Sequence, residues 1–349
     1  EWVYDFNEKN LKNKIQFFIK KYNELLKNKD TSWNTEIKWS RDLKKKFTQS
    51  KKIKYSKSLI THANYRPFCK RLFYSEKILN DILTQNHTTI FGENLDKKNI
   101  GICINKNEAD DRLLATDKIY DLHFTGDAVC IPLYRYTKTG EKINNITTWG
   151  IEQFRSQYND TNIEGNDIFN YVYAVLHNPA YRQKYQLNLK REYPRIPFYN
   201  EFWKWANWGK ELIDLHVDYE TVEPYKLKII EEKNTQQPPK TKLKALPENG
   251  EIIVDENTLL TEIPELAWQY KLGNRSALHW ILDQYKEKNY TETVLNKYPD
   301  KRILAENYNL YKFSDYKKNF IDLIKKITSV SIRTMEIINQ METEELKKE

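Results

Sequence analysis

The sequence contains few of the residues on which several classes of protein depend. Only three cysteines, Cys69, Cys103 and Cys130, occur among its 349 residues, and they are widely spaced. They match no metal-binding pattern and, with one left over, they form no complete disulfide framework. A reducing compartment is the simplest interpretation of this cysteine usage, so we expect a cytoplasmic protein.

Long apolar runs and short catalytic motifs are also absent. No segment reaches the roughly 18 apolar residues of a membrane span, and no signal peptide is visible. The sequence holds no phosphate-binding GxxxxGKS or GxGxxG loop, no HExxH motif and no CxxC pair. We therefore predict no catalytic residue, no metal site and no cofactor within this chain. Because it begins at Glu1 rather than at a methionine, we expect it to be a piece of a longer protein.

Aromatic and basic residues are abundant instead. Hydrophobic residues make up 39% and aromatic residues 13% of the sequence, which is enough for a packed core and argues against disorder. The 57 Lys and Arg residues exceed the 49 Asp and Glu residues, which gives a formal charge of +8. Residues 1–58 alone contain 16 basic and 7 acidic residues. Such an excess favours anionic partners such as nucleic acid, and the length favours two or three packed units.

The character of the sequence changes along the chain, and we predict a mixed α+β fold. Apolar residues at steps of three and four predict an amphipathic helix over 10–28, and a second basic helix is expected over 38–48. Residues 1–52 are therefore expected to form a basic helical segment. Short β-rich runs between Ile53 and Tyr136 predict a sheet of five or more strands, within a β-rich part that covers residues 53–147.

Helices return after residue 147. Two are expected within 166–190, broken at Pro179, because a proline fits the first turn of a helix, where its missing N–H is not needed. A small β excursion is expected near 225–262. We therefore take residues 148–349 as a mainly helical part, with further helices expected at 200–216, 274–288 and 314–341.

Two short stretches resemble catalytic motifs, and each has a simpler explanation. Asn178-Pro179-Ala180-Tyr181 resembles the loop with which amino-methyltransferases hold a flipped base. Here it joins two predicted helices without a glycine-rich cofactor loop before it, so we interpret it as a helix N-terminus. Glu231-Glu232-Lys233, with Asp218 upstream, resembles a Mg²⁺-dependent nuclease site. In a chain rich in Glu and Lys, a charged strand end is favoured.

Four longer motifs occur in a fixed order, together with the opening "EWVYDFNEKNLKNKIQFFIKKYN". They are "YRPFCKRLFYSE" (65–76), "DIFNYVYAVLHNPAYRQKYQLNLKREYPRIPF" (167–198), "FWKWANWGKELIDLHVDYE" (202–220) and "YKLGNRSALHWILDQYKEK" (270–288). In this combination the chain resembles, over about residues 1–341, the C-terminal target-recognition region of the Type ISP restriction–modification enzymes. One departure is Cys69, which stands where an acidic residue is expected.

The resemblance implies a function in DNA recognition. Enzymes of this family carry nuclease, helicase-like ATPase, adenine methyltransferase and DNA-recognition parts in one polypeptide. The chain is then expected to read a sequence in double-stranded DNA and to position it for methylation and ATP-dependent restriction by upstream domains, without being an enzyme itself. S-adenosylmethionine, ATP and Mg²⁺ would belong to the parent protein. The alternative is a structural coupling module between motor and methyltransferase, with only weak non-specific DNA binding.

The first candidate DNA contact is the motif at residues 65–76. Pro67 biases Arg66 toward an extended backbone, and a strand over 66–74 would place Arg66 and Lys70 on one face and Arg71 on the other. DNA contact by these three side chains competes with a structural role, in which Arg66 pairs with an internal carboxylate or with carbonyl groups. We expect Cys69 to be a small packed residue.

Two further basic clusters are candidates. The second cluster, Lys271, Asn274 and Arg275, lies at the expected start of the helix over 274–288. Arg275 and Ser276 are expected to begin this helix. The free backbone N–H groups at a helix start suit a phosphate. The alternative is an ordinary Asn or Ser cap. The third cluster consists of Arg182, Lys190, Arg191 and Arg195. We expect these side chains either to follow a DNA backbone or to form a solvated helix face.

Base-reading residues are expected on loops, because loops on a rigid scaffold commonly carry recognition. The candidates are residues 84–99 and 105–112, which lie in the β-rich part. The basic helices of residues 1–52 are expected to attract DNA non-specifically or to link the chain to the methyltransferase domain upstream.

Overall fold

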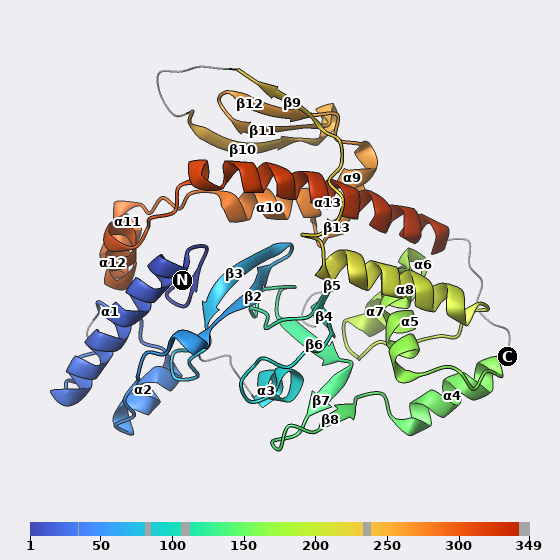
Figure 1. Ribbon diagram of the computed structural model, residues 1–349, viewed down its shortest axis with the longest axis horizontal. Helices are drawn as coiled ribbons and strands as arrows, with labels where there is room; N and C mark the ends of the chain where they lie inside the picture. The colour runs from blue at the N-terminus through green and yellow to red at the C-terminus, as the bar shows by residue number, and fades with distance from the viewer. Residues whose placement is uncertain (34, 81–84, 106–111, 233–238, 342–349) are drawn as a thin grey trace. The chain divides into compact units, whose positions relative to one another are not determined.

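Two compact units form the part of the chain that the computed structural model describes, which is residues 1–33, 35–80, 85–105, 112–232 and 239–341. The first unit comprises Glu1–Ala63, Lys70–His87 and Glu287–Asp315, and the second comprises Asn64–Cys69, Thr88–Lys286 and the chain from Tyr316 onward. Helices and several small sheets together make the predicted mixed α+β fold (Figure 1). The sequence analysis divided the chain by expected role into residues 1–52, 53–147 and 148–349. That division stays a prediction.

The first unit is built around two helices that the sequence predicted, α1 (Glu8–Lys27) and α2 (Arg41–Thr48). Asn7 and Ser40 cap them, since each side chain accepts a hydrogen bond from a backbone N–H of the first turn, at 3.0 and 3.1 Å. The apolar stripe of α1 is buried in a core rich in aromatic rings. This unit also contains β1 (Tyr4–Asp5), η1 (Lys57–Leu59), α11 (Glu292–Lys297) and α12 (Pro299–Asn307).

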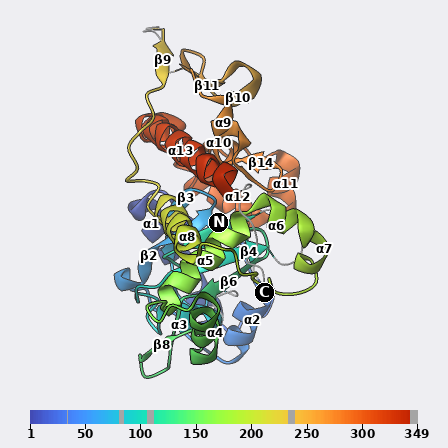
Figure 2. The same cartoon turned by 90° about the vertical axis from the view of Figure 1, so that its right-hand side faces the viewer.

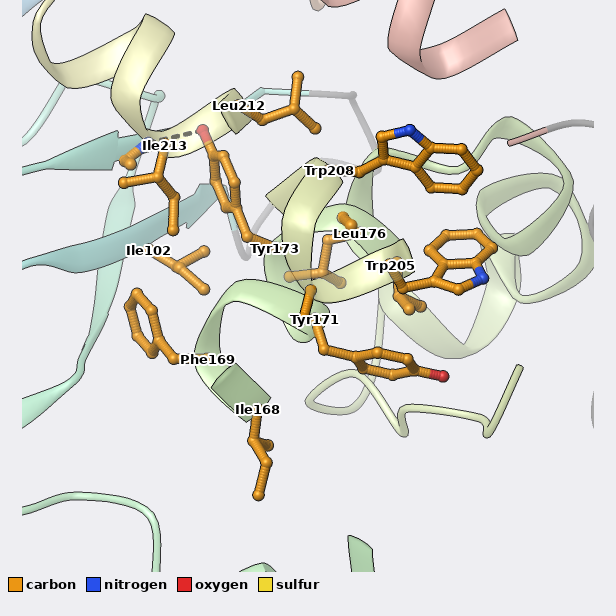
Figure 3. Close-up of a cluster of buried hydrophobic side chains, with 14 of the residues drawn as sticks. Ile102, Ile168, Phe169, Tyr171, Tyr173, Leu176, Trp205, Trp208, Leu212 and Ile213 are labelled. Carbon is orange, nitrogen blue, oxygen red and sulfur yellow. Dashed lines mark hydrogen bonds between the residues drawn. The ribbon is translucent and has the colours of Figure 1, made fainter. Parts of the chain in front are cut away.

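Helices α5 (Gly165–His177) and α8 (Phe202–Val217) lie side by side in the second unit (Figure 2). Gly209 of α8 permits this packing, because a Cβ added there would lie only 1.7 Å from the backbone oxygen of Asn170 in α5. Tyr171 and Trp205, one from each helix, belong to the same buried cluster (Figure 3).

Tyr173 connects this helix pair to a sheet. Its hydroxyl accepts a hydrogen bond of 2.9 Å from the backbone N–H of Ala115 in β5 (Leu113–Thr116), and Figure 3 marks this bond. The same hydroxyl lies 2.7 Å from Nδ1 of His216, whose Nε2 lies 3.0 Å from Oγ1 of Thr334. A continuous buried polar network therefore runs through the core of the second unit.

The β-rich stretch does not form the predicted single sheet of five or more strands. In the described residues its strands belong to three small sheets, with orders β1-β3-β2, β5-β4-β6 and β7-β8. Pro132 ends β6, since proline has no N–H to continue a ladder. The run "KIYDLHF" contributes only an isolated bridge, between Asn64 and Tyr120. The strands are β2 (Ile60–Arg66), β3 (Cys69–Tyr74), β4 (Gly101–Asn105), β6 (Ala128–Pro132), β7 (Tyr134–Tyr136) and β8 (Lys142–Asn144).

The predicted β excursion near 225–262 is confirmed as an antiparallel sheet. Its four strands have the order β10-β11-β12-β9. They are β9 (Lys228–Glu231), β10 (Thr241–Leu246), β11 (Glu251–Asp255) and β12 (Thr258–Thr261). The predicted last helix is α13 (Phe313–Met341). Within the described part of the chain, every helix is too short or too polar to span a bilayer.

Acid should destabilise the second unit through His177 and His216. Burial lowers the pKa of His177 from 6.5 to about 3, and burial, followed by the nearby His177, lowers the pKa of His216 well below 6.5. Below pH 6.5 the unfolded chain takes up protons that the folded chain does not, so the stability present above pH 6.5 is lost as the pH falls toward 3.

Thermal denaturation at a series of pH values tests this expectation. The melting temperature should fall between about pH 7 and about pH 4, and His177→Gln should flatten the dependence because it removes one titrating group. His123→Gln, at an exposed position, is the matched control and should leave the profile unchanged. An unchanged profile in the His177 variant would contradict the assignment.

Candidate nucleic-acid interface

The first candidate motif is a hairpin rather than one continuous strand. β2 ends at Arg66 and β3 begins at Cys69, so residues 66–74 do not continue as the single strand considered in the sequence analysis. Phe68 has a left-handed backbone (φ +53) and Pro67 has no N–H to donate, and together these two residues form the turn. The ring of Phe68 is buried and lies 5.3 Å, edge-on, from that of Tyr219, which anchors the turn in the core of the second unit.

Arg66 has an internal partner. Its Nη1 donates to Oδ1 of Asp121 at 2.6 Å, and the two side chains are only 19% and 18% exposed. The guanidinium also lies 4.1 Å from the ring centroid of Tyr65. The structure therefore contains the carboxylate pairing that was the alternative for Arg66, while its contact with DNA stays a prediction.

The other residues of this motif differ in burial. Lys70 and Arg71 are half-buried, and the guanidinium of Arg71 lies 4.5 Å from the ring centroid of Phe6. Cys69 is buried, as predicted for a small packed residue. The three basic side chains are thus held close to the protein surface rather than extended into solvent.

Arg66→Ala should lower stability, because it leaves the largely buried Asp121 without its cationic partner. Hydrogen bonds to charged groups contribute about 1.5–3 kcal/mol, so the free energy of unfolding should fall by about that amount. Chemical denaturation of Arg66→Ala, Asp121→Asn and the double variant measures the coupling between the two side chains. Fully additive effects would show that the ion pair contributes nothing.

The third basic cluster lies on short helices. The predicted helical run to residue 190 is interrupted, with α6 (Pro179–Lys184) and α7 (Gln186–Leu189) in its place. Arg182 is half-buried, and Arg195 pairs with Glu192 at 2.9 Å. Lys190 and Arg191 are exposed and have no carboxylate partner within the described residues. These two side chains best fit the predicted phosphate contacts.

The second cluster lies on a tight hairpin. β13 (Lys271–Leu272) and β14 (Arg275–Ser276) pair through a turn at Gly273 (φ +69) and Asn274, and α10 (Ala277–Tyr285) follows. The prediction that Arg275 and Ser276 begin the helix is wrong, because both are extended. Ser276 is instead the N-cap, whose Oγ accepts a hydrogen bond from the His279 N–H at 3.3 Å.

This hairpin forms one wall of an open groove of about 920 Å³. Lys271, Asn274 and Arg275 all line it, so the structure brings one predicted cluster together around a concave surface. The other lining residues come mainly from η2 (Pro247–Asn249), from Gly250 and Ile263, and from α9 (Glu265–Gln269). Gly250 (φ +66) allows the backbone to pack closely against Ile263, since a Cβ there would lie 2.7 Å from the backbone oxygen of Ile263.

The groove has an uneven distribution of charge. Lys271 is exposed and has no carboxylate partner in the described part of the chain, whereas Arg275 pairs with Asp283. Glu248 of η2 and Glu265 of α9 also line the groove. Positive potential is therefore concentrated on the β13–β14 side, where Lys271 is the cation available to a ligand.

His279 adds a hydrogen-bonding group to the groove. Its Nδ1 lies 2.7 Å from Oγ of Ser276. Burial lowers the pKa of His279, with Asp283 opposing this effect and Arg275 and Lys271 adding to it. The ring is then neutral at pH 7 and accepts or donates without carrying charge.

Sequence reasoning missed the groove residues outside the motif. Trp268 is buried, lies 5.5 Å edge-on from His279, and its Nε1 has no hydrogen-bond partner within the described residues. It precedes Lys271 by three positions, so proximity along the chain was an available signal. Gly250 and Glu248 are more than 20 positions away from Lys271 and gave no local signal.

Both catalytic resemblances have structural explanations. Asn178 caps α6, because its Oδ1 accepts from the Ala180 N–H at 2.8 Å, and Pro179 occupies the first turn as predicted. Glu231 pairs with Lys317 at 3.0 Å, and that lysine also pairs with the buried Asp255 at 2.9 Å. Lys233 lies outside the described residues. No group of three His, Cys, Asp or Glu side chains suited to a metal occurs in the described ranges.

The two loops expected to read bases are only partly described. Residue 84 and residues 106–111 lie outside the described residues. The remainder of the first loop, residues 85–99, begins with the helix α3 (Gln85–Phe91). Their role in base reading stays a prediction.

Exposed cations beside an open groove on a mixed α+β scaffold are typical of a domain that binds an anionic polymer. The comparison with protein families is specific: residues 1–322 match the Type ISP C-terminal specificity domain. The chain belongs to this family. This confirms the resemblance found in the sequence and identifies a recognition module rather than an enzyme. A search of curated proteins gave no match.

Three similar solved structures are described as complexes with DNA or with a DNA substrate mimic. The DrdV–DNA complex, determined by cryo-electron microscopy, is 38% identical with a TM-score of 0.91, over 99% of this chain and 35% of that one. A nuclease-deletion mutant of the Type ISP restriction-modification enzyme LlaGI, in complex with a DNA substrate mimic, is 29% identical with a TM-score of 0.77, over 99% and 32%.

The third is the ATP-dependent Type ISP restriction-modification enzyme LlaBIII bound to DNA. It is 24% identical with a TM-score of 0.81, over 99% of this chain and 22% of that one, and this likeness shows the fold alone. The chain thus spans between 22% and 35% of the length of these proteins.

Proposed function

We propose that this chain recognises a specific sequence in double-stranded DNA, as the target-recognition module of a larger restriction–modification enzyme. The observation that carries the proposal is the family match together with the similarity, over 99% of the chain at a TM-score of 0.91, to part of a protein solved in complex with DNA. The groove beside Lys271 and the exposed Lys190 and Arg191 supply cations for phosphates.

The DNA contacts extend beyond these three lysine and arginine residues. The full proposed set is Arg66, Lys70, Arg71, Arg182, Lys190, Arg191, Arg195, Lys271, Asn274 and Arg275. Arg66, Arg195 and Arg275 already have carboxylate partners, so each must share or exchange its partner in order to bind a phosphate. Lys271, Lys190 and Arg191 need no such exchange and contribute most of the affinity.

Methylation and restriction belong to other parts of the same polypeptide. Upstream methyltransferase and helicase-like domains, working in the cytoplasm with S-adenosylmethionine, ATP and Mg²⁺, act on the site that this chain holds. In the described residues the carboxylates of Glu231 and Asp255 are paired with Lys317. This chain's own contribution is to bind and orient the duplex, and its basic N-terminal helices link it to the methyltransferase domain.

Selection from a random-centre duplex library tests the proposal directly. The 349-residue chain should enrich one asymmetric sequence and bind it at least about 1,000-fold more tightly than unrelated duplexes. Equal affinity for every sequence, lost at about 0.2 M salt, would leave only the coupling module with weak non-specific binding.

Lys271→Ala should weaken binding of the selected duplex without unfolding the chain. Loss of one phosphate contact should lower the slope of log affinity against log salt by about 1 and affect all sequences equally. Lys244→Ala removes the same charge from an exposed position of β10 and is the matched control. Equal slopes for the two variants would exclude Lys271 from the interface.

A further inference from the structure

A two-stranded ribbon projects from the second unit and belongs to none of the predicted contacts. β7 and β8 pair antiparallel, with Arg135 opposite Ile143 and Tyr136 opposite Lys142, and no third strand joins them within the described residues. The connecting loop is held by its own hydrogen bonds, including Gly140 N–H to the Thr137 oxygen at 2.9 Å. The ribbon is therefore an ordered element without a neighbouring strand.

The two faces of the ribbon differ, because successive side chains point to opposite sides and cross-strand partners share a side. The face with Tyr134 and Tyr136 is fixed to the protein: Tyr134 packs against the core cluster, and the Tyr136 hydroxyl donates to the Lys98 oxygen at 2.8 Å. The face with Arg135 and Ile143 is exposed, and Ile143 is 38% accessible. One face anchors the ribbon and the other is open to a partner.

The open side of the ribbon carries unpaired positive charge. Arg135 and Lys138 are exposed and have no carboxylate partner in the described part of the chain, unlike Arg66, Arg195 and Arg275. Lys142 lies 3.6 Å from the ring centroid of Tyr134, on the anchored side. The tip is unobstructed, since a Cβ added at Gly140 would meet no atom within 4 Å. Charge and access both suit a polyanion.

The next element along the chain adds an exposed aromatic ring. Trp149, in the first turn of α4 (Thr148–Tyr158), is 73% exposed, although large apolar side chains are usually buried. Its helix is firmly held, because Thr147 caps it and Arg155 Nε donates to the Ile163 oxygen at 2.9 Å. Both views place β8 of the ribbon and α4 toward the same end of the second unit (Figures 1 and 2).

We propose that the β7–β8 ribbon enters the major groove of duplex DNA, with Arg135 and Ile143 toward the base edges and Lys138 on a phosphate. The inference rests on the proposed DNA-recognition function and adds a contact site to it. A major groove about 12 Å wide admits a two-stranded antiparallel ribbon. An arginine there reads guanine, an apolar side chain contacts the thymine methyl group, and Trp149 packs against the flanking backbone.

The test uses the duplex that the unmodified 349-residue chain selects from a random-centre library. Arg135→Ala/Lys138→Ala should bind this duplex at least about tenfold more weakly, with the salt slope lowered by about 1 through the lost Lys138 phosphate contact. Arg135→Ala alone should also relax the selected sequence at one or two positions, whereas loss of a phosphate contact would weaken all sequences equally. Lys242→Ala/Lys244→Ala removes two exposed charges from β10 and should change the affinity little.

The possible failures are distinguishable. If the unmodified chain selects no sequence, the proposed function fails, and this inference fails with it. If the chain selects a sequence and the Arg135/Lys138 variant binds it as tightly as before, only the ribbon assignment is overturned. The ribbon would then be a docking surface for another protein domain. Equal loss in the ribbon and control variants would also overturn the assignment, because it would show that net charge alone matters.

Discussion

Gly209→Ala is expected to destabilise the second unit by about 3 kcal/mol or more. The added Cβ would lie 1.7 Å from the Asn170 backbone oxygen and 2.5 Å from its carbonyl carbon. Backbone atoms of a buried helix cannot rotate away as a side chain can, so α5 and α8 must separate. Separation would expose the cluster that contains Tyr171 and Trp205.

Gly150→Ala is the matched control for this substitution. Gly150 also lies in a helix, α4, but its added Cβ would meet Thr147 Oγ1 at 3.5 Å, an ordinary contact. Alanine is a better helix former than glycine, so this variant should be stabilised by about 0.5–1 kcal/mol. Thermal denaturation monitored by circular dichroism measures both. Equal melting temperatures for the two variants would show that the helix pair tolerates the methyl group.

Features set by local sequence were predicted well. The amphipathic stripe of α1, the break at Pro179 and the last helix α13 follow from periodicity and proline chemistry within a few residues. The environment of Cys69 was also predicted, because a small thiol among aromatic residues packs readily. Such features need no knowledge of distant parts of the chain.

Features set by distant contacts were not predicted. Asp121, the partner of Arg66, lies 55 positions away, and alternation alone could not show that Pro67 and Phe68 turn the chain. The separate small sheets arise in the same way, since strand pairing joins segments far apart in sequence. One predicted run, "AVCIPLYRY", contains both β6 and β7, and treating it as a unit concealed the ribbon.

The candidate groove shows both cases at once. Its cationic wall, from Lys271 to Arg275, was named from a motif of a few residues, although the helix begins two positions later than predicted. Its other lining residues come mainly from η2 and α9, which the motif does not contain. Shape depends on non-local packing, and a basic cluster becomes a concave site only where such packing places other walls beside it.

Lys14→Met is expected to destabilise the first unit by about 3–5 kcal/mol, since removal of one partner leaves a buried charge uncompensated. The Lys14 ammonium lies 2.6 Å from Oδ2 of Asp5 and 2.5 Å from the Tyr4 oxygen, and the two charged side chains are 6% and 13% exposed. Lys14 thereby joins α1 to β1.

Asp5→Asn with Lys14→Met should be less destabilised than Lys14→Met alone, because no lone charge remains. Lys57→Met, which breaks an exposed ion pair with Glu8, is the control and should change the melting temperature little. If the double variant is no more stable than Lys14→Met, the loss arises from packing and backbone hydrogen bonds rather than from the stranded carboxylate.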